Sequence, residues 1–436
     1  MDTERGRDLE KTPSSAHTVP SPQQSPRRSP GPPPEGGLRA WLALCSGATV
    51  MALSFGMVNS FGVYQSYYEN KYPHMSSNTL SIIGSLQGCL TFATALPSTV
   101  GMYYLGPQAM VGAGGLICIL SYMFLSITTA PWQLFVVQGL MFGLGSGLMY
   151  VHCAGVVFQY FHRRKAIASG LITSGASMAG VYWPIGVRGL INKVGFAWGN
   201  RIIGFLYIPM VAFATTNLRP RVPPPPRKPG QNVLRVNFRV LLNWRFQVLN
   251  VSFAVAILGL FPGLFYVDLF CQRLGVARPI QDYNVAIVNA ATLLGRVSCG
   301  YVGDKLGRFN VMIPTLVLSG VLSLALWIPA RSSAAALAFC ITWGFATGPF
   351  VSLAPAILGQ LFADELPSYL GVFFPTASVG VLVGPIIAGT FIPPGHVDTV
   401  EGFDKLSVFV GVLFLAAAAS LSALRLVYQR RLLAKM

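Results

Sequence analysis

Long apolar blocks of about 20 residues each recur along this 436-residue chain and limit the folds open to it. A helix of that length crosses the hydrocarbon core of a bilayer, which is about 30 Å thick. Lipid offers the backbone no hydrogen-bond partners, so such blocks must be helices that pair their own N–H and C=O groups. Only 10% of the residues are charged, against about a quarter in soluble proteins. The pattern predicts an all-α polytopic membrane protein.

The apolar blocks form two sets of six on either side of a polar linker at residues 218–246. We predict spans at residues 40–66, 79–103, 107–128, 132–158, 165–187, 198–217, 247–270, 282–303, 309–329, 333–357, 368–392 and 404–427. Two matched sets indicate two homologous six-helix bundles, at residues 39–217 and 247–428. Residues 1–38 are rich in Pro, Ser and charge, which predicts a disordered tail, and residues 429–436 form a second tail.

The net charge of +17 has two readings. Nucleic-acid binding would need a basic face on a folded soluble domain, and the sequence predicts no such domain. If both termini and the linker are cytoplasmic, 22 of the Lys and Arg residues lie inside, eight lie outside, and Arg296 lies within a span. This asymmetry is typical of multi-pass membrane proteins. We therefore expect cytoplasmic termini and no nucleic-acid partner. We expect the protein in the plasma membrane, with the vacuolar membrane as the alternative.

The connection between the eighth and ninth spans reads GYVGDKLGR. We expect Gly300 and Gly307 to permit a tight turn there. Asp304, Lys305 and Arg308 can make ion pairs across the helix ends. Because this loop borders water, each pair is worth about 1 kcal/mol or less. The segment therefore suits a gating latch that closes in one state and breaks in another.

This connection resembles the loop motif of the major facilitator superfamily. Three further stretches are similar to its monocarboxylate-porter-like branch, which is common in fungi: residues 35–41 (EGGLRAW), 160–170 (YFHRRKAIASG) and 380–389 (GVLVGPIIAG). The equivalent loop in the first half, residues 101–107 (GMYYLGP), keeps the glycines but lacks the charged residues. The resemblance implies a secondary transporter that works by alternating access, with the first, fourth, seventh and tenth spans lining a central cavity.

Arg296 is the only Lys or Arg deep inside a predicted span, where it must face protein or water. By the resemblance it matches the branch's eighth-span Arg, which pairs with an Asp one turn earlier and helps bind the substrate carboxylate. Thr292 stands at that earlier position here. Two readings stay open: Arg296 binds an anionic substrate, or backbone carbonyls and water satisfy it and it serves the gate. Asn59 matches the branch's first-span Lys, which argues against a simple lactate or pyruvate carrier.

Candidates for proton coupling are few. His152 in the fourth span has a side chain that titrates near neutral pH and could relay a proton, or it could be a neutral hydrogen-bonding residue. Asp268 lies near the outer end of the seventh span, and no Asp or Glu occupies the middle of any predicted span. Coupled transport and facilitated diffusion therefore both stay open. Tyr64, Tyr150 and Trp343 could stack on a planar ligand or could simply pack in the core.

These patterns predict a secondary transporter of an organic acid or secondary metabolite. Efflux is favoured, because Asn59 and Thr292 stand where carriers of short acids in this branch have a Lys and an Asp, while Arg296 is kept. The alternative is an importer of a monocarboxylate or vitamin-like compound, by proton symport or facilitated diffusion. A membrane enzyme would need a polar cluster, and an ATP-driven pump would need a phosphate loop. The seven Cys form no CxxC pair, so we expect no metal site. We also expect no cofactor, and a monomer whose partners are substrate, protons and lipid.

Overall fold

The computed structural model describes residues 33–75, 77–222, 238–362, 366–392 and 402–428. Most of the predicted N-terminal tail, the middle of the predicted linker and the predicted C-terminal tail lie outside these ranges. Within them, every regular element is a helix and no strand occurs. The predicted all-α fold class is therefore confirmed.

The first half of the chain forms six membrane passages, some of them built from several consecutive helices. Its elements are α1 (Leu38–Leu53), α2 (Phe55–Asn59), α3 (Phe61–Lys71), α4 (Ser77–Ala93), α5 (Ala95–Leu125), α6 (Pro131–Leu134), the π-helical segment η1 (Phe135–Met141), α7 (Phe142–Tyr150), α8 (His152–Val157) and α9 (Lys165–Asn217). The first passage runs through α1, α2 and α3, and the fourth runs from α6 through η1 and α7 to α8.

The second half forms the other six passages with fewer breaks. After the short 3-10 helix η2 (Phe238–Leu242) come α10 (Trp244–Arg273), α11 (Arg278–Leu306), α12 (Arg308–Leu322), the π-helical segment η3 (Ser323–Trp327), α13 (Ser333–Leu361), α14 (Leu366–Thr390) and α15 (Phe403–Tyr428). The predicted linker therefore ends in helix, since α10 begins inside its last residues.

Two glycines divide helices that would otherwise run through two spans. In the described residues, eleven helical stretches are long and apolar enough to cross a bilayer. One of them, α9, has 53 residues, more than twice the length that one span needs. Gly195 inside α9 has φ 81° and ψ 168°, a left-handed backbone conformation that favours glycine. α9 therefore contains the fifth and sixth passages, and all twelve predicted spans are present. Gly106 divides α5 in the same way.

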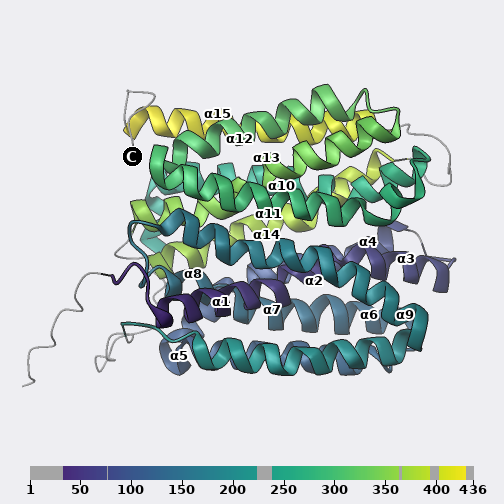
Figure 1. Cartoon of the computed structure of the whole chain (residues 1–436), viewed down its shortest axis with the longest axis horizontal. Coiled ribbons are helices and arrows are strands. Elements are labelled where there is room, and N and C mark those ends of the chain that lie inside the picture. The colour runs from purple at the N-terminus through teal and green to yellow at the C-terminus, as the bar shows by residue number, and fades with distance from the viewer. Residues whose placement is uncertain (1–32, 76, 223–237, 363–365, 393–401, 429–436) are drawn as a thin grey trace, which may run out of the picture. The chain divides into compact units, whose positions relative to one another are not determined.

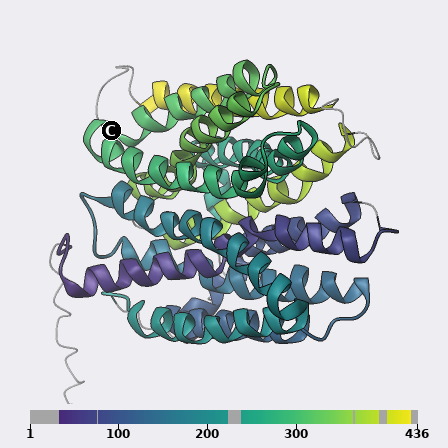
Figure 2. The same cartoon turned by 45° about the vertical axis from the view of Figure 1, so that its right-hand side comes forward.

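The helices of each half pack mainly with one another. In Figures 1 and 2 the purple-to-teal helices of the first half lie together, and the green-to-yellow helices of the second half lie beside them. α1 packs on α9 and α5 packs on α7, while α10 packs on α14 and α15. The halves meet where α9 contacts α11 and where α4 contacts α14. This division places any central cavity between α9, α11 and their neighbours.

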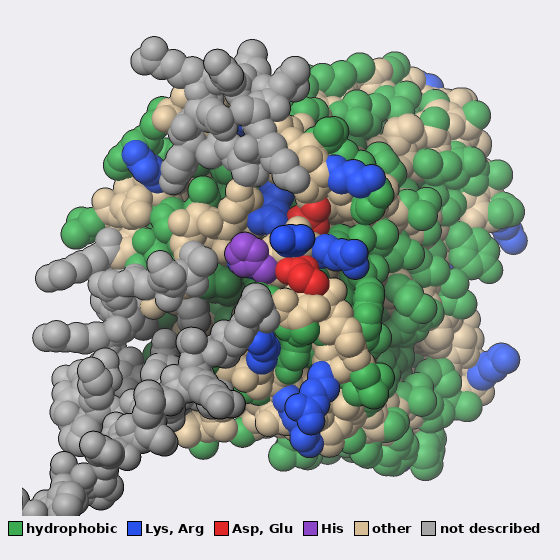
Figure 3. Space-filling model, turned by 60° about the vertical axis from the view of Figure 1, so that its left-hand side comes forward, with side chains coloured by type: hydrophobic (Ala, Val, Ile, Leu, Met, Phe, Trp, Pro, Cys, Tyr) green, Lys and Arg blue, Asp and Glu red, His purple; other side chains and the backbone are tan. Residues whose placement is uncertain are grey.

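The sides of the bundles are apolar and one end is basic. Large side chains such as Leu120, Phe205 and Val412 are exposed along the helices, as expected of a surface that faces lipid. The end where α1 begins and α15 ends lies at the left of Figure 1 and comes forward in Figure 3. Lys and Arg side chains gather there beside acidic side chains and a His. We call this end the basic face and the other end the opposite face.

Candidate functional site

A narrow cavity lies between the two halves. Its wall comes from α1, α2, α4, α7 and α9 of the first half and from α10, α11 and α13 of the second. The four passages expected to line a central cavity, the first, fourth, seventh and tenth, all contribute to it. The second, fifth and eighth passages contribute as well, through α4, α9 and α11. Its volume is only about 50 Å³, so the central cavity is nearly closed in this state.

Polar and aromatic side chains come to this cavity from different halves. Asn289, Thr292 and Arg296 follow one another at spacings of three and four residues, so they lie on one face of α11. The aromatic rings in the wall are those of Phe55, Phe92, Tyr150 and Phe261. The arrangement offers one polar helix face and a largely apolar remainder, which suits an amphipathic small molecule.

Arg296 is buried in the wall, with 7% of its surface exposed. Its Nη1 donates a hydrogen bond to the backbone carbonyl of Thr173 in α9, across the boundary between the halves. Its Nε is buried without a hydrogen-bond partner in the described part of the chain. A guanidinium has five N–H donors, and a buried cation without a counter-ion is costly. The side chain therefore has donors left for an acceptor that enters the cavity.

Asn59 joins the first passage to the eighth. Its Nδ2 donates to Oδ1 of Asn289 at 3.4 Å, a long bond that links the two halves. Asn289 in turn donates to the backbone carbonyl of Val285 in its own helix. Asn59 also lines a second, larger cavity on the side of the opposite face. It therefore stands between the two spaces, without the charge that a Lys would bring there.

The structure does not bring Tyr64 or Trp343 to the central cavity. The hydroxyl of Tyr64 donates to Oδ1 of Asn200 at 2.9 Å inside the first bundle. The indole Nε1 of Trp343 donates to the hydroxyl of Ser323 at 3.1 Å inside the second bundle. Both side chains are almost completely buried, so their polar atoms are satisfied by protein. Of the three aromatic residues proposed for stacking on a ligand, Tyr150 alone lies in the cavity wall.

His152 is also buried away from the cavity. Its Nε2 lies 2.8 Å from the hydroxyl oxygen of Ser98, and 2% of the residue is exposed. The contact links α8 to α5 within the first bundle. This placement favours the reading of His152 as a hydrogen-bonding residue of the bundle over the reading as a proton relay.

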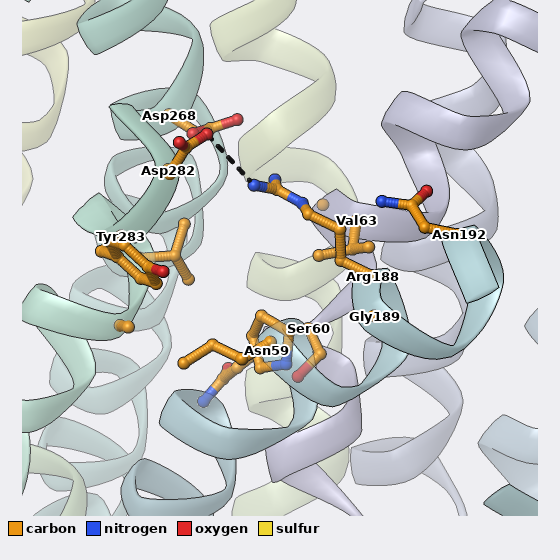
Figure 4. Close-up of a pocket in the computed structure, with 14 residues that line it drawn as sticks. Asn59, Ser60, Val63, Arg188, Gly189, Asn192, Asp268, Asp282 and Tyr283 are labelled. Atoms are coloured by element: carbon orange, nitrogen blue, oxygen red, sulfur yellow. Dashed lines mark hydrogen bonds and ion pairs between the residues drawn. The ribbon is translucent and has the colours of Figure 1, made fainter. Parts of the chain in front are cut away.

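A wider vestibule of about 320 Å³ opens toward the opposite face. Arg188 of α9 and Asp282 of α11 reach toward each other across it, with 3.4 Å between Nη1 and the carboxylate oxygen (Figure 4). Asp268 of α10 lies beside Asp282 in the same wall. Its carboxylate accepts hydrogen bonds from Nδ2 of Asn284 at 2.7 Å and Nε2 of Gln272 at 2.8 Å. The vestibule thus combines two carboxylates with one guanidinium.

A latch closes the basic face. The carboxylate of Asp304 in α11 accepts hydrogen bonds from the backbone N–H groups of Ala166 at 3.1 Å and Ile167 at 2.9 Å. These are free N–H groups of the first turn of α9, where the helix dipole favours an anion. Arg308 pairs with the same carboxylate at 3.0 Å and donates to the carbonyl of Ala356 in α13. One acidic side chain therefore ties both halves together.

Two expectations for this connection were wrong in detail. Gly300 is not part of the turn: it lies inside α11, and a Cβ there would meet the carbonyl oxygen of Ala166 at 2.9 Å. It lets α9 approach, while Gly307, with φ 100°, makes the turn alone. Lys305 makes no ion pair in the described residues. Its Nζ lies 4.2 Å from the centre of the Tyr301 ring. Local sequence spacing could not distinguish the end of a helix from the turn after it.

The latch continues along one face of α9. Nζ of Lys165 donates to the carbonyl of Gly359 at 3.0 Å, and the hydroxyl of Ser169 donates to the carbonyl of Ser352 at 2.6 Å. The carbonyl of Thr173, one further turn along, accepts from Arg296. Spacings of four residues keep these groups on one stripe, and every bond crosses to the second half. The structure is therefore closed at the basic face and open at the opposite face.

Glu35 holds the segment that precedes α9. Its Oε1 accepts hydrogen bonds from the backbone N–H groups of His162 and Arg163, both at 2.6 Å, and its own N–H donates to the carbonyl of Tyr160. The ring of Trp41 lies edge-on against Phe161, with 6.0 Å between centroids. The predicted tail therefore joins the fold before residue 39. Two of the three stretches similar to the monocarboxylate-porter-like branch, residues 35–41 and 160–170, contact each other here.

Several site residues were not predicted from the sequence. Asn289 shares a helix face with Arg296, and counting back seven residues from the buried Arg would have found it. Nothing in the local sequence marks Phe55 and Phe92 as site residues, because an aromatic residue in an apolar span is predicted to pack in the core. Arg188 was counted only as a charge outside the membrane, and Asp282, the first residue of the predicted eighth span, was not singled out. No group of three or more His, Cys, Asp or Glu in the described residues is placed to hold a metal ion.

Comparisons with known proteins agree on one family. The family model for the Major Facilitator Superfamily matches residues 42–385. The "MFS transporter asaE" of Aspergillus flavus is 34% identical over 419 residues, which cover 93% of this chain and 92% of that protein.

Two further relatives have names that state a direction of transport. The "Agnestins efflux protein AgnL12" of Paecilomyces divaricatus is 30% identical, over 91% of this chain and 90% of its own length. The "Aspyridones efflux protein apdF" of Emericella nidulans is 29% identical, over 89% of this chain and 77% of its own length.

Proposed function

Because this chain belongs to the major facilitator superfamily and is a multi-pass membrane transporter, we propose that it exports a small organic acid or acidic secondary metabolite by alternating access. Two relatives that align with most of the chain carry efflux in their names. The substrate would bind in the central cavity from the cytoplasm and leave through the vestibule. We further propose that the chain belongs to the monocarboxylate-porter-like branch, because residues 35–41 and 160–170 resemble two of its motifs.

The proposal of an acidic substrate rests on the unsatisfied guanidinium of Arg296. It is buried at the cavity, its Nε lacks a partner, and Thr292 rather than an acid precedes it by one turn. An anion at this point would supply the missing counter-charge, and a bidentate carboxylate fits the guanidinium fork. The bond from Nη1 to Thr173 crosses the halves, so substrate binding and the contact between the halves compete for the same side chain.

Proton coupling is proposed at Asp268 rather than at His152. Asp268 lines the vestibule, where a proton can reach it from outside, while its neutral partners Asn284 and Gln272 hold it in place. Arg188 and Asp282 are the charged groups in the same wall. Proton uptake here fits exchange of an external proton for an internal substrate. The same feature fits the second candidate, proton-linked import of a monocarboxylate or vitamin-like compound.

The proposed topology places the basic face in the cytoplasm. Arg163, Arg164 and Lys165 lie there, whereas Arg188 and Arg331 lie at the opposite face, as the positive-inside rule expects. Both termini would then be cytoplasmic, with bundles at residues 39–217 and 247–428. We propose the plasma membrane, where export removes a compound from the cell, and a monomer as the working unit.

Metabolite profiles of cells and medium, with and without the gene, test export. We expect deletion to raise the cell-to-medium ratio of at least one organic acid, and the unaltered gene to restore it. Arg296→Gln should fail to restore it, because the cavity loses its cation. Arg331→Gln is the matched control, since Arg331 pairs with Asp404 at an exposed site far from the cavity. An unchanged ratio for every acid, or full restoration by Arg296→Gln, would refute the proposal.

A further inference from the structure

The wall of the central cavity indicates the chemical class of the apolar part of the substrate as well as the sign of its charge. The rings of Phe55, Phe92 and Tyr150 come from three helices of the first half and touch one another. The centroid distances are 4.8 Å from Phe55 to Phe92 and 4.9 Å from Phe55 to Tyr150. Phe374 packs behind them, 4.7 Å from Tyr150. Mutual packing holds these rings in place before any ligand arrives, which lowers the entropy lost on binding.

Most polar side chains of the same wall already have partners within the protein. The hydroxyl of Thr292 donates to Val288 at 2.6 Å, and the hydroxyl of Thr347 donates to Trp343 at 2.9 Å. The amide of Asn289 donates to its own helix and accepts from Asn59. A ligand rich in hydroxyl groups would find few free donors here. In the described residues, Nε of Arg296 is buried without a partner and the hydroxyl of Tyr150 makes no hydrogen bond, so the cavity offers one charged anchor and one phenolic hydroxyl.

From these two observations we infer that the transported compound is a planar aromatic acid with one anionic group, whose carboxylate meets Arg296 and whose ring system packs face-on or edge-on against the inclined rings of Phe55, Phe92 and Tyr150. This inference rests on the proposed function and narrows its substrate class. The run from Arg296 back to Asn289 spans about 10 Å along α11, close to the long edge of two or three fused rings. A wall of preformed aromatic rings favours a ligand with its own aromatic system over a globular hydrocarbon.

Three commercial acids separate the possibilities. Anthraquinone-2-carboxylate is planar, adamantane-1-carboxylate is apolar but globular, and gluconate is an acid with many hydroxyl groups. Their binding would be measured by isothermal titration calorimetry on the detergent-purified full chain, with empty micelles as the blank. We expect the planar acid to bind at least tenfold more tightly than the globular acid, and gluconate to bind least.

Two variants assign the selectivity to the wall. Phe92→Leu keeps an apolar side chain but loses the ring, and should weaken the planar acid by roughly three- to tenfold while leaving the globular acid unchanged. Arg296→Gln should weaken both. Phe270→Leu is the matched control, because Phe270 packs on Trp327 and Phe403 away from the cavity and should change neither affinity. Thermal unfolding of each variant establishes that it is folded.

Three results would overturn the inference: equal affinity for the planar and globular acids, no binding of the planar acid above empty micelles, or no effect of Phe92→Leu on folded protein. These results would leave export itself untouched, because the metabolite profiles test it without any assumption about rings. Conversely, unchanged profiles with strong planar selectivity would remove the proposed direction of transport and keep the ligand class.

Discussion

A buried hydroxyl in a lipid-embedded bundle needs a partner, and Tyr64 has one in Asn200. We predict that Tyr64→Phe lowers the free energy of unfolding by about 0.5–1.5 kcal/mol, because Oδ1 of Asn200 loses its donor. Transport should keep its half-saturation concentration, since the hydroxyl does not reach the cavity. Unfolding in mixed micelles and flux in cells would measure the two effects.

The matched control for that variant is Tyr182→Phe. Tyr182 is partly exposed on α9, and no hydrogen bond of its hydroxyl is present among the described residues, so stability should stay unchanged. A changed half-saturation concentration in Tyr64→Phe with unchanged stability would contradict this prediction and indicate that Tyr64 contacts the substrate.

Sequence reasoning at this scale is most informative where a residue differs in chemistry from its neighbours. Arg296 stands out in an apolar span, and the structure places it in the cavity wall beside Asn59 and Tyr150. It left Tyr64 and Trp343 undecided, because an aromatic residue packs equally well in a core and in a cavity wall. The rotation of each helix decides between those places, and the packing of the neighbouring helices sets that rotation. No local pattern in one span contains it.

At the scale of elements, the segment before α9 is held from two sides. Glu35 binds the N–H groups of His162 and Arg163, while Asp304 binds those of Ala166 and Ile167. Only the Asp304 contact crosses the two halves. When the basic face opens, the Asp304 bonds must break and the Glu35 bonds can persist. Glu35 can therefore hold the segment that leads into α9 in both states.

We predict that Glu35→Ala speeds amide hydrogen exchange at His162 and Arg163 by several-fold, because both N–H groups lose their acceptor. Glu35→Gln should have a smaller effect, since its amide oxygen still accepts. Hydrogen exchange followed by mass spectrometry would resolve the peptide that contains these residues.

Arg39→Gln is the control for the Glu35 variants, because Arg39 is exposed at the start of α1. Its exchange pattern should match that of the parent chain. Equal exchange at His162 and Arg163 in Glu35→Ala and in the parent would show that the two hydrogen bonds do not hold the segment.

The spans themselves were predictable, because lipid imposes both their length and their apolar character. The connections were less so. Gly307 makes the turn and Gly300 makes room for α9, yet both are glycines of one motif. The difference depends on which helix packs against α11, and that contact joins residues more than a hundred positions apart. The sequence predicts a connection over residues 188–197, whereas the structure keeps that segment helical and confines the break to Gly195.

At the scale of the whole molecule, the contacts place the two ends in opposite states. The basic face is sealed by Asp304, Lys165 and Ser169, while the opposite face has an open vestibule with a single long ion pair across it. Breaking the seal should therefore shift the population toward the state that opens at the basic face. Each bond of the seal is modest, so the loss of one charge moves the balance without unfolding either bundle.

We predict that Asp304→Asn slows the labelling of a vestibule cysteine from outside. Ala286 lines the vestibule, and Ala286→Cys should react with a membrane-impermeant maleimide added to intact cells. Asp304→Asn weakens the hold on the first turn of α9 and on Arg308, so fewer molecules expose the vestibule at any moment. A loss of about 1 kcal/mol would lower the fraction facing outward by up to about fivefold. Asp404→Asn is the matched control, because Asp404 pairs with Arg331 at an exposed site that does not cross the halves. Equal labelling rates in Asp304→Asn and the parent would mean that the latch does not set the state of the transporter.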